Sequence, residues 1–251
     1  MSQEMTATIM ALFVIFCRVG ACLMLLPGYS SVRVPMQIRL FVAFAVSLAV
    51  SPGILPGLLP LMREAGDDVR LQMIVTELLN GMLIGLLGRV FMIALQFSTT
   101  YIANAIGMGQ AIGIPLDESE PAPAVVSLIT MTATVLIFSM NLHVEILRAL
   151  VASYTAMPVA LGFTARAGLV ALTDNLDMTF TLCLRIASPF VIYGVIVNFA
   201  IGLANKMTPQ IPIYFISLPF VIAGGLVLLG YAVGDYLHIF IAGFQQWILV
   251  G

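Results

Sequence analysis

The sequence predicts an all-α, multi-pass membrane protein built from long helices and helical hairpins. Three observations lead to this fold class. Hydrophobic residues make up 61% of the 251 residues and charged residues only 9%, and the mean hydropathy is +1.10. About a quarter of the residues of a soluble domain are charged, so this chain could not cover a water-facing surface. Its apolar residues also gather in runs of about 20 or more, the length that a helix needs to cross a bilayer.

Six apolar stretches and one shorter stretch follow one another along the chain. The six cover about 5–27, 40–62, 71–107, 124–160, 178–205 and 211–234, and the shorter one covers about 236–250. The third would form a helix of about 55 Å, whereas the hydrocarbon core of a bilayer is about 30 Å thick. The long stretches therefore either project beyond the membrane or break into hairpins. The first stretch contains Arg18 and has no basic residue before it, so we interpret it as a retained span and not a signal peptide.

Composition and motifs argue against several classes of function. The net charge is −2 and no basic run is present, which argues against a nucleic-acid partner. The three cysteines lack metal-ligand spacing, and no plausible Ser/His/Asp set is evident. The glycine-rich run at 107–113 does not match a nucleotide-binding loop, because no Gly-Lys-Ser/Thr follows it. We therefore expect a protein that is not an enzyme and needs no metal or cofactor.

Six charged residues lie within the apolar stretches and are predicted to be buried, because charges at bilayer depth usually face a partner or a watery cavity. They are Arg18, Glu77, Arg89, Glu145, Arg148 and Arg185. Glu145 and Arg148 are three residues apart, so they share a helix face and could neutralise each other. The alternative is a proton path through His143 and Glu145. The ion pair is favoured, because a relay normally needs more titratable groups than this chain offers.

Glycines mark two further features. Gly81, Gly85 and Gly88 punctuate the third stretch, and the spacing of the first two allows close helix packing. The segment from Gly107 to Pro123 combines glycines with apolar side chains between two over-long helices. Such a loop could fold back and block a passage, because a hydrophobic constriction gates by excluding water. It could equally be an ordinary re-entrant or periplasmic loop.

The run Ile-Gly-Leu-Ala-Asn-Lys-Met-Thr-Pro-Gln-Ile-Pro-Ile-Tyr at 201–214 resembles the signature of the FliR family. These are flagellar export-gate proteins, whose injectisome counterparts are called SctT. The most specific positions are Asn205, Lys206, Pro209 and Gln210. The entry segment is similar to the family's N-terminal pattern at Arg18-Val-Gly, Pro27, Val34-Pro35 and Arg39. The central loop is similar in the order Gln96, Gly107, Gln110, Gly113, Asp117, so the resemblance runs essentially end to end.

This resemblance implies one integral membrane domain over 1–251, with a FliP-like part over about 1–177 and a FliQ-like C-terminal hairpin over about 178–251. It implies a single subunit that completes a helical ring with FliP-like and FliQ-like subunits in the bacterial inner membrane, at the flagellar basal body. An FlhB-like switch protein would be a further partner, and exported flagellar proteins the cargo. The loop near 107–123 would plug the pore with Gly107, Met108, Gln110, Ile112, Gly113, Ile114 and Asp117.

The sequence departs from the family pattern at two positions. Leu142 stands where many relatives have the glycine of Asn-Gly-His, and Glu118 stands where many have a proline after the loop aspartate. These changes put in doubt a close backbone approach at the first position and the detailed path of the plug at the second.

Two other functions stay open at this point. One is the injectisome version of the same gate. The other is a stand-alone transporter of small solutes, which would need two related halves with paired broken helices. No such internal symmetry is visible.

Overall fold

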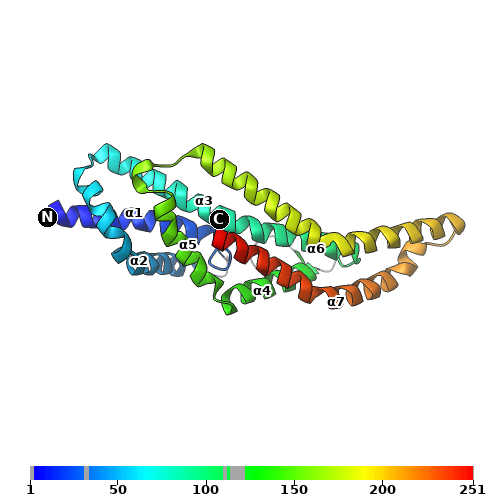
Figure 1. The fold of residues 1–251 in the computed structure, drawn as a ribbon. Helices are drawn as coiled ribbons and strands as arrows, with labels where there is room; N and C mark the ends of the chain where they lie inside the picture. Colours follow the sequence, from blue (N-terminus) through cyan, green and yellow to red (C-terminus); the bar gives the residue numbers. More distant parts are fainter. Residues whose placement is uncertain (1–2, 31–33, 110–111, 114–121, 251) are drawn as a thin grey trace. The chain divides into compact units, whose positions relative to one another are not determined.

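The computed structural model describes residues 3–30, 34–109, 112–113 and 122–250. Their contacts group the chain into two compact units. Unit 1 comprises Met1–Val90 and Asn141–Leu176, and unit 2 comprises Phe91–Met140 and Asp177–Gly251. The chain is almost entirely helical, which confirms the predicted all-α class (Figure 1). The predicted division into FliP-like and FliQ-like parts near residue 177 stays a prediction.

Unit 1 is built around the N-terminal helices. It contains α1 (Gln3–Leu25), α2 (Met36–Glu64), the first part of α3 (Asp67–Ala105), α5 (Leu142–Ala156), the 3-10 turn η1 (Val159–Leu161) and the start of α6 (Ala165–Met207). The short α2–α3 connection is held by Arg70, whose guanidinium donates to the Met62 carbonyl at 2.8 Å and to Asp67 at 2.9 Å. The last carbonyl groups of a helix lack intrahelical donors, so Arg70 satisfies the end of α2.

Helix α2 stays helical although three prolines lie inside it, at Pro52, Pro56 and Pro60. A proline has no N–H to donate to the carbonyl four residues earlier. The buried hydroxyl of Ser51 donates to the Leu48 carbonyl at 2.8 Å, the group that Pro52 leaves without its usual donor. A side chain thus replaces one of the missing backbone hydrogen bonds.

Glycines of α3 let α1 approach closely. A Cβ atom at Gly81 would collide with the backbone carbonyl of Arg18, and one at Gly85 would lie 2.7 Å from the Cys22 carbonyl. Gly88, the third predicted packing glycine, is also buried. Glycine at these positions removes the side chain that would otherwise keep the two helices apart.

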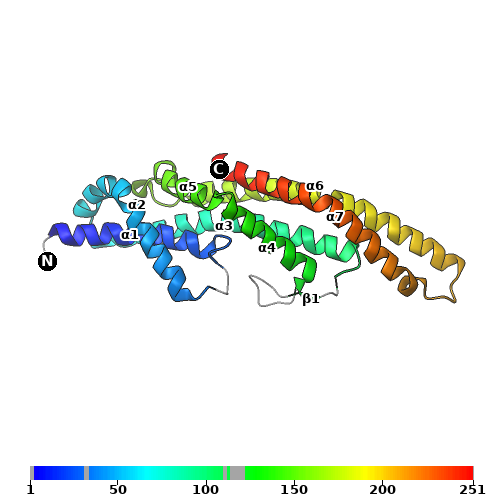
Figure 2. The ribbon, with the colours of Figure 1, turned by 90° about the horizontal axis from the view of Figure 1, so that it is seen from below.

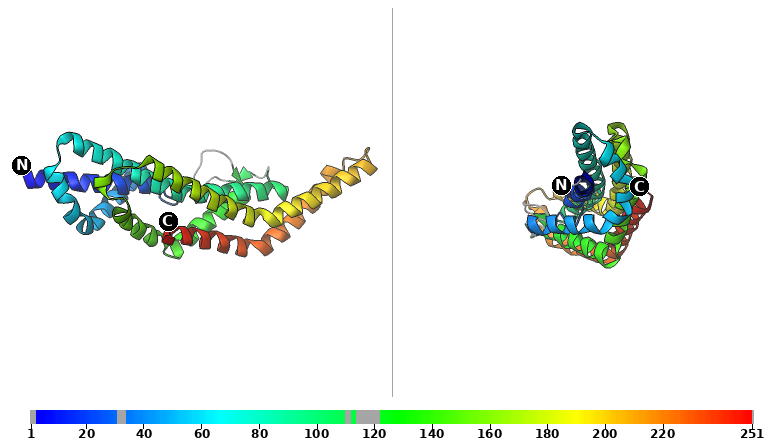
Figure 3. Two further views of the ribbon diagram at one scale, coloured as in Figure 1. Left: turned by 45° about the horizontal axis from the view of Figure 1, so that its top comes forward. Right: turned by 90° about the vertical axis from the view of Figure 1, so that its left-hand side faces the viewer.

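Unit 2 contains the end of α3, α4 (Ala124–Ser139), the rest of α6 and α7 (Ile213–Val250). Two short strands, β1 (Ile112–Gly113) and β2 (Ala122–Pro123), pair antiparallel before α4 (Figure 2). From residue 177 onward, α6 runs beside α7 as an antiparallel hairpin (Figures 1 and 3). The aromatic core of unit 2 joins Phe91 on α3 to Phe244 and Trp247 on α7, with ring centroids 5.5 and 5.4 Å apart.

The apolar stretches map onto helices with one correction. Residues 71–107 form one long helix, α3, whereas residues 124–160 break into α4 and α5 with a 69° bend. Asn141 makes this break, because it adopts the left-handed conformation (φ 59°) that ends a helical run. The predicted separation between 211–234 and 236–250 is wrong. Asp235 lies on the exposed side of α7, so its charge does not interrupt the helix.

The helices agree with the predicted membrane class. Within the described residues, five helices are long and apolar enough to cross a membrane: α1, α2, α3, α6 and α7. The bent α4–α5 pair would add a sixth if it forms one span.

We predict that Gly81→Ala destabilises the protein by about 1–3 kcal/mol, because the added methyl group would force α3 away from the Arg18 carbonyl. Thermal unfolding of the purified full chain in detergent measures this effect. Gly53→Ala in α2 is the matched control, since a Cβ atom there meets nothing within 4 Å. Equal stability of the two variants would contradict the close α1–α3 contact.

Candidate functional site

A buried ion pair joins three helices at the centre of unit 1. Arg18 on α1 donates through Nε to Glu77 Oε2 and through Nη2 to Glu77 Oε1, each at 2.6 Å. Both side chains have 0% solvent exposure. Two parallel hydrogen bonds between a guanidinium and a carboxylate form the strongest common protein ion pair. Helices α1 and α3 are therefore joined by charge as well as by their close backbone approach.

The remaining donors of Arg18 hold the end of α5. Its Nη1 donates to Ser153 Oγ at 3.1 Å, and its Nη2 also donates to the Met157 carbonyl at 2.8 Å. Met157 is the C-cap of α5, and the C-terminal end of a helix carries partial negative charge that favours a cation. The Tyr154 ring adds a cation–π contact, with the Arg18 Cζ atom 4.0 Å from the ring centre.

This geometry offsets the cost of burying two charges. Removing an ion from water costs several kcal/mol, and mutual attraction repays it only when further hydrogen bonds satisfy the remaining donors and acceptors. Arg18 has Ser153 and the Met157 carbonyl, and Glu77 also accepts a long hydrogen bond from Asn80 at 3.4 Å. The charges are compensated locally, so the cluster can hold α1, α3 and α5 in one arrangement.

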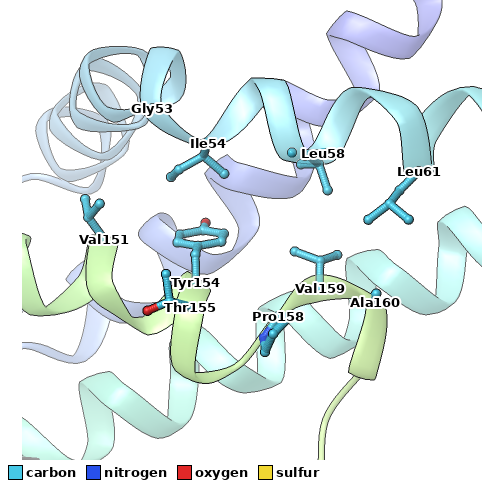
Figure 4. A pocket seen from close by; sticks show the side chains of 11 residues that line it. Gly53, Ile54, Leu58, Leu61, Val151, Tyr154, Thr155, Pro158, Val159 and Ala160 are labelled. Carbon is cyan, nitrogen blue, oxygen red and sulfur yellow. The ribbon is translucent and has the colours of Figure 1, made fainter.

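A cavity of about 360 Å³ adjoins the ion pair (Figure 4). Its walls come from α2, α5 and the turn after α5. The lining residues are Gly53, Ile54, Gly57, Leu58, Leu61, Val151, Tyr154, Thr155, Pro158, Val159 and Ala160. Tyr154 belongs to both features, because its ring lines the cavity and contacts Arg18. Among the residues that the structure describes, its hydroxyl has no hydrogen-bond partner.

The structure buries two of the six charges that were predicted to be buried. Arg18 and Glu77 are buried, Arg89 and Glu145 are half-buried, and Arg148 and Arg185 are exposed on the isolated chain. For Arg148 and Arg185, burial against a partner or in the assembled protein stays a prediction. The expected pairing of Glu145 with Arg148 does form, at 2.6 Å, but on the surface of α5.

The predicted plug begins at the end of α3. Gly107 adopts a positive φ of 77°, and the Met108 N–H donates to the Ala103 carbonyl at 2.8 Å, which terminates the helix. A Cβ atom at Gly107 would lie 3.3 Å from side-chain atoms of Leu218 and Ile222 on α7. Of the later plug residues, Ile112 and Gly113 form β1, and Gln110, Ile114 and Asp117 lie outside the described residues.

The residues of the family signature lie at the α6–α7 connection. Asn205 and Lys206 are in the last turn of α6, and Pro209 and Gln210 lie in the turn before α7; all four are exposed. In the N-terminal pattern, Arg39 donates to the Val34 carbonyl at 2.9 Å and so fixes the segment that enters α2.

Sequence reasoning found both members of the central ion pair but did not pair them. Arg18 and Glu77 are 59 residues apart in the chain, so no helical spacing connects them. The available signal was that each is an isolated charge in an apolar stretch, one positive and one negative. No sequence pattern indicated the cavity, because its lining residues are mostly apolar or small and come from separate segments of the chain.

The fold and site define a multi-pass helical membrane protein whose long apolar helices are held by a buried charge cluster. Comparison with protein families places residues 9–247 in one family, described as bacterial export proteins, family 1. The chain belongs to this family, and the resemblance noted in the sequence is confirmed.

Relatives with curated names agree with this membership. The chain is 26% identical over 215 residues to the flagellar biosynthetic protein FliR of Caulobacter vibrioides, covering 86% of this chain and 85% of the relative. It is 26% identical over 235 residues to the protein of the same name from Aquifex aeolicus, covering 91% and 86%. The Escherichia coli FliR is 27% identical over 148 residues, covering 55% and 57%.

We predict that Glu77→Ala destabilises the full chain by about 3–5 kcal/mol, because it leaves the Arg18 guanidinium buried without its counter-charge. Replacing both residues by methionine should restore much of this loss. Thermal unfolding in detergent measures the variants. The control is Glu145→Ala, which breaks an exposed pair and should cost at most about 1 kcal/mol. If the double methionine variant loses as much stability as Arg18→Met and Glu77→Met lose together, the pairing is contradicted.

Proposed function

We propose that this protein is a subunit of the flagellar type III protein export gate. The observation that carries the proposal is the match to the export-protein family from residue 9 to residue 247. The curated relatives, all named flagellar biosynthetic protein FliR, point to the flagellar version of the apparatus. The bacterial inner membrane at the flagellar basal body is the corresponding location, and no catalytic step is part of this function.

In the proposed assembly, the chain completes a helical ring with FliP-like and FliQ-like subunits. The exposed surface of the isolated chain supports this idea. Large apolar side chains are exposed on α2, α6 and α7, including Phe41, Phe199 and Phe220 at 71, 73 and 76%. Exposed apolar patches of this kind mark contacts with protein or lipid. The C-terminal hairpin would contact an FlhB-like switch protein, and exported flagellar proteins would pass through the ring.

The loop after α3 would act as the pore plug. Two features of the described residues support this role. The left-handed Gly107 turns the chain sharply out of α3, and the pairing of β1 with β2 closes the loop at its base. The apolar side chains of its first part, such as Met108 and Ile112, would block water and ions in the resting gate.

Two alternatives remain for comparison. An injectisome export gate would use the same fold, and the partner set distinguishes it from the flagellar gate. A stand-alone solute transporter is supported less, because the family match is to export proteins. Solute uptake by the purified chain in vesicles would favour that alternative.

We predict that the tagged full chain co-purifies with FliP-like and FliQ-like subunits when the three are expressed together and extracted in mild detergent. Mass spectrometry of the purified complex identifies the partners. A variant with exposed α2 side chains changed to serine, such as Phe41→Ser with Leu48→Ser, should recover less of them. Recovery of the intact chain as a monomer, with the partners present in the membrane, would count against the proposal.

We predict that deleting residues 107–113 makes the membrane leaky to small ions when the full gate is expressed, because the resting pore loses its block. Ion conductance of cells or of reconstituted vesicles measures the leak. The Glu145→Gln variant, which changes a half-buried residue of α5 outside the loop, should leave the membrane tight. Unchanged conductance in a deletion variant that still assembles with its partners would refute the plug.

A further inference from the structure

The α6–α7 hairpin of unit 2 changes character along its length. In α7, every buried residue except Gly225 lies after Asp235, and these include Tyr236, Phe240 and Phe244. In α6, no residue after Gly194 is buried. The half of the hairpin near its turn therefore has almost no core of its own, whereas the other half packs into the protein.

Charged residues follow the same division. Arg166, Asp174, Asp177 and Arg185 are exposed along the first half of α6. The next segment, 186–205, carries no charge until Lys206, and α7 carries none before Asp235. At 1.5 Å per residue, the uncharged segment of α6 is about 30 Å long. This is also about the thickness of the hydrocarbon core of a bilayer.

The ends of the uncharged segment lie at matching levels on the two helices. Arg185 and Asp235 each lie about 33 Å from the helix end that adjoins the turn. The helices are in contact between these levels, since the Tyr193 hydroxyl donates to the Val221 carbonyl at 2.6 Å. One charged level therefore contains Arg185 and Asp235, and the other contains Lys206.

Exposed tyrosines mark the same two levels. Tyr214 lies in the first turn of α7 and is 58% exposed, and Tyr231 lies one turn before Asp235 and is 87% exposed. Tyrosine gathers at both surfaces of a bilayer, where its ring sits in apolar surroundings and its hydroxyl reaches water. The exposed side chains between the two levels are large and apolar, for example Ile196 and Val227 at 62 and 75%.

We propose that the distal half of the hairpin, residues 186–205 with 213–234, is a lipid-facing anchor that spans the bilayer. The proximal halves within unit 2, 177–185 of α6 and 235–250 of α7, lie outside the hydrocarbon. Arg185 and Lys206 face the anionic phosphate groups of lipids at the two surfaces, which gives the charge complementarity that a protein-covered surface would not need. This inference does not depend on the proposed function, because it concerns only which part of the chain contacts lipid.

Depth-dependent fluorescence quenching tests the proposal. The full chain carrying Ile196→Cys is labelled with a fluorophore and placed in phospholipid vesicles that contain nitroxide lipids. Its native cysteines, Cys17, Cys22 and Cys183, are buried and should label weakly. We expect nitroxides deep in the acyl chains to quench the label at Ile196 several-fold more than nitroxides at the headgroup. Thr181→Cys, an exposed position on the proximal half of α6, is the matched control and should show the reverse order.

Changing the charge at the boundary provides a second test. Arg185→Leu should let the hairpin slide deeper, so that quenching of the Thr181 label by deep nitroxides rises, whereas Arg185→Lys should leave it unchanged. Circular dichroism confirms that each variant remains helical. The proposal is overturned if the labels at Ile196 and Thr181 report the same depth. It is also overturned if neither label is quenched, which would mean that protein covers the whole hairpin.

Discussion

Unit 1 depends on one interaction, the buried pair between Arg18 and Glu77. Burying two charges costs desolvation free energy, and contacts from three helices offset this cost. Helix α1 supplies the cation and α3 the carboxylate. Near the end of α5, the Ser153 hydroxyl and the Met157 carbonyl accept further hydrogen bonds from Arg18. An apolar contact would tolerate sliding of one helix past another, whereas a two-pronged hydrogen-bonded pair does not. The pair therefore fixes the register of three helices whose surfaces are otherwise apolar and nonspecific.

The same crossing shows why glycine accompanies the charge. Glu77 and Gly81 are one helical turn apart on α3, and Gly81 lies against the backbone carbonyl of Arg18 itself. A larger residue at Gly81 would separate α1 from α3 and lengthen the distance that Arg18 must reach. Close backbone approach and charge pairing therefore depend on each other. Gly81 lets α1 come near enough for Arg18 to reach the Glu77 carboxylate at 2.6 Å.

Sequence reasoning predicted what depends on local composition and missed what depends on distant contacts. The helical class, the long third helix and the Glu145–Arg148 pair all follow from neighbouring residues. The partner of Arg18 lies 59 positions away, so no periodicity could identify it. Asp235 falls between the predicted stretches 211–234 and 236–250, because a charge lowers local hydropathy. A charge on the exposed side of a helix costs the backbone nothing, so α7 continues through it.

High hydropathy reports that a segment avoids water, but it does not say what replaces the water. In α1 the replacement is the protein itself, because Ala11, Ile15 and Val19 are fully buried. In the most apolar 18-residue stretch of α7, which lies in its distal part, only 6% of the residues are buried. The two helices have similar hydropathy, yet half of the apolar stretch of α1 is already covered by the protein, whereas almost all of that of α7 needs lipid or a partner to cover it. The extent of burial, read beside the positions of the charges, separates these environments where hydropathy alone cannot.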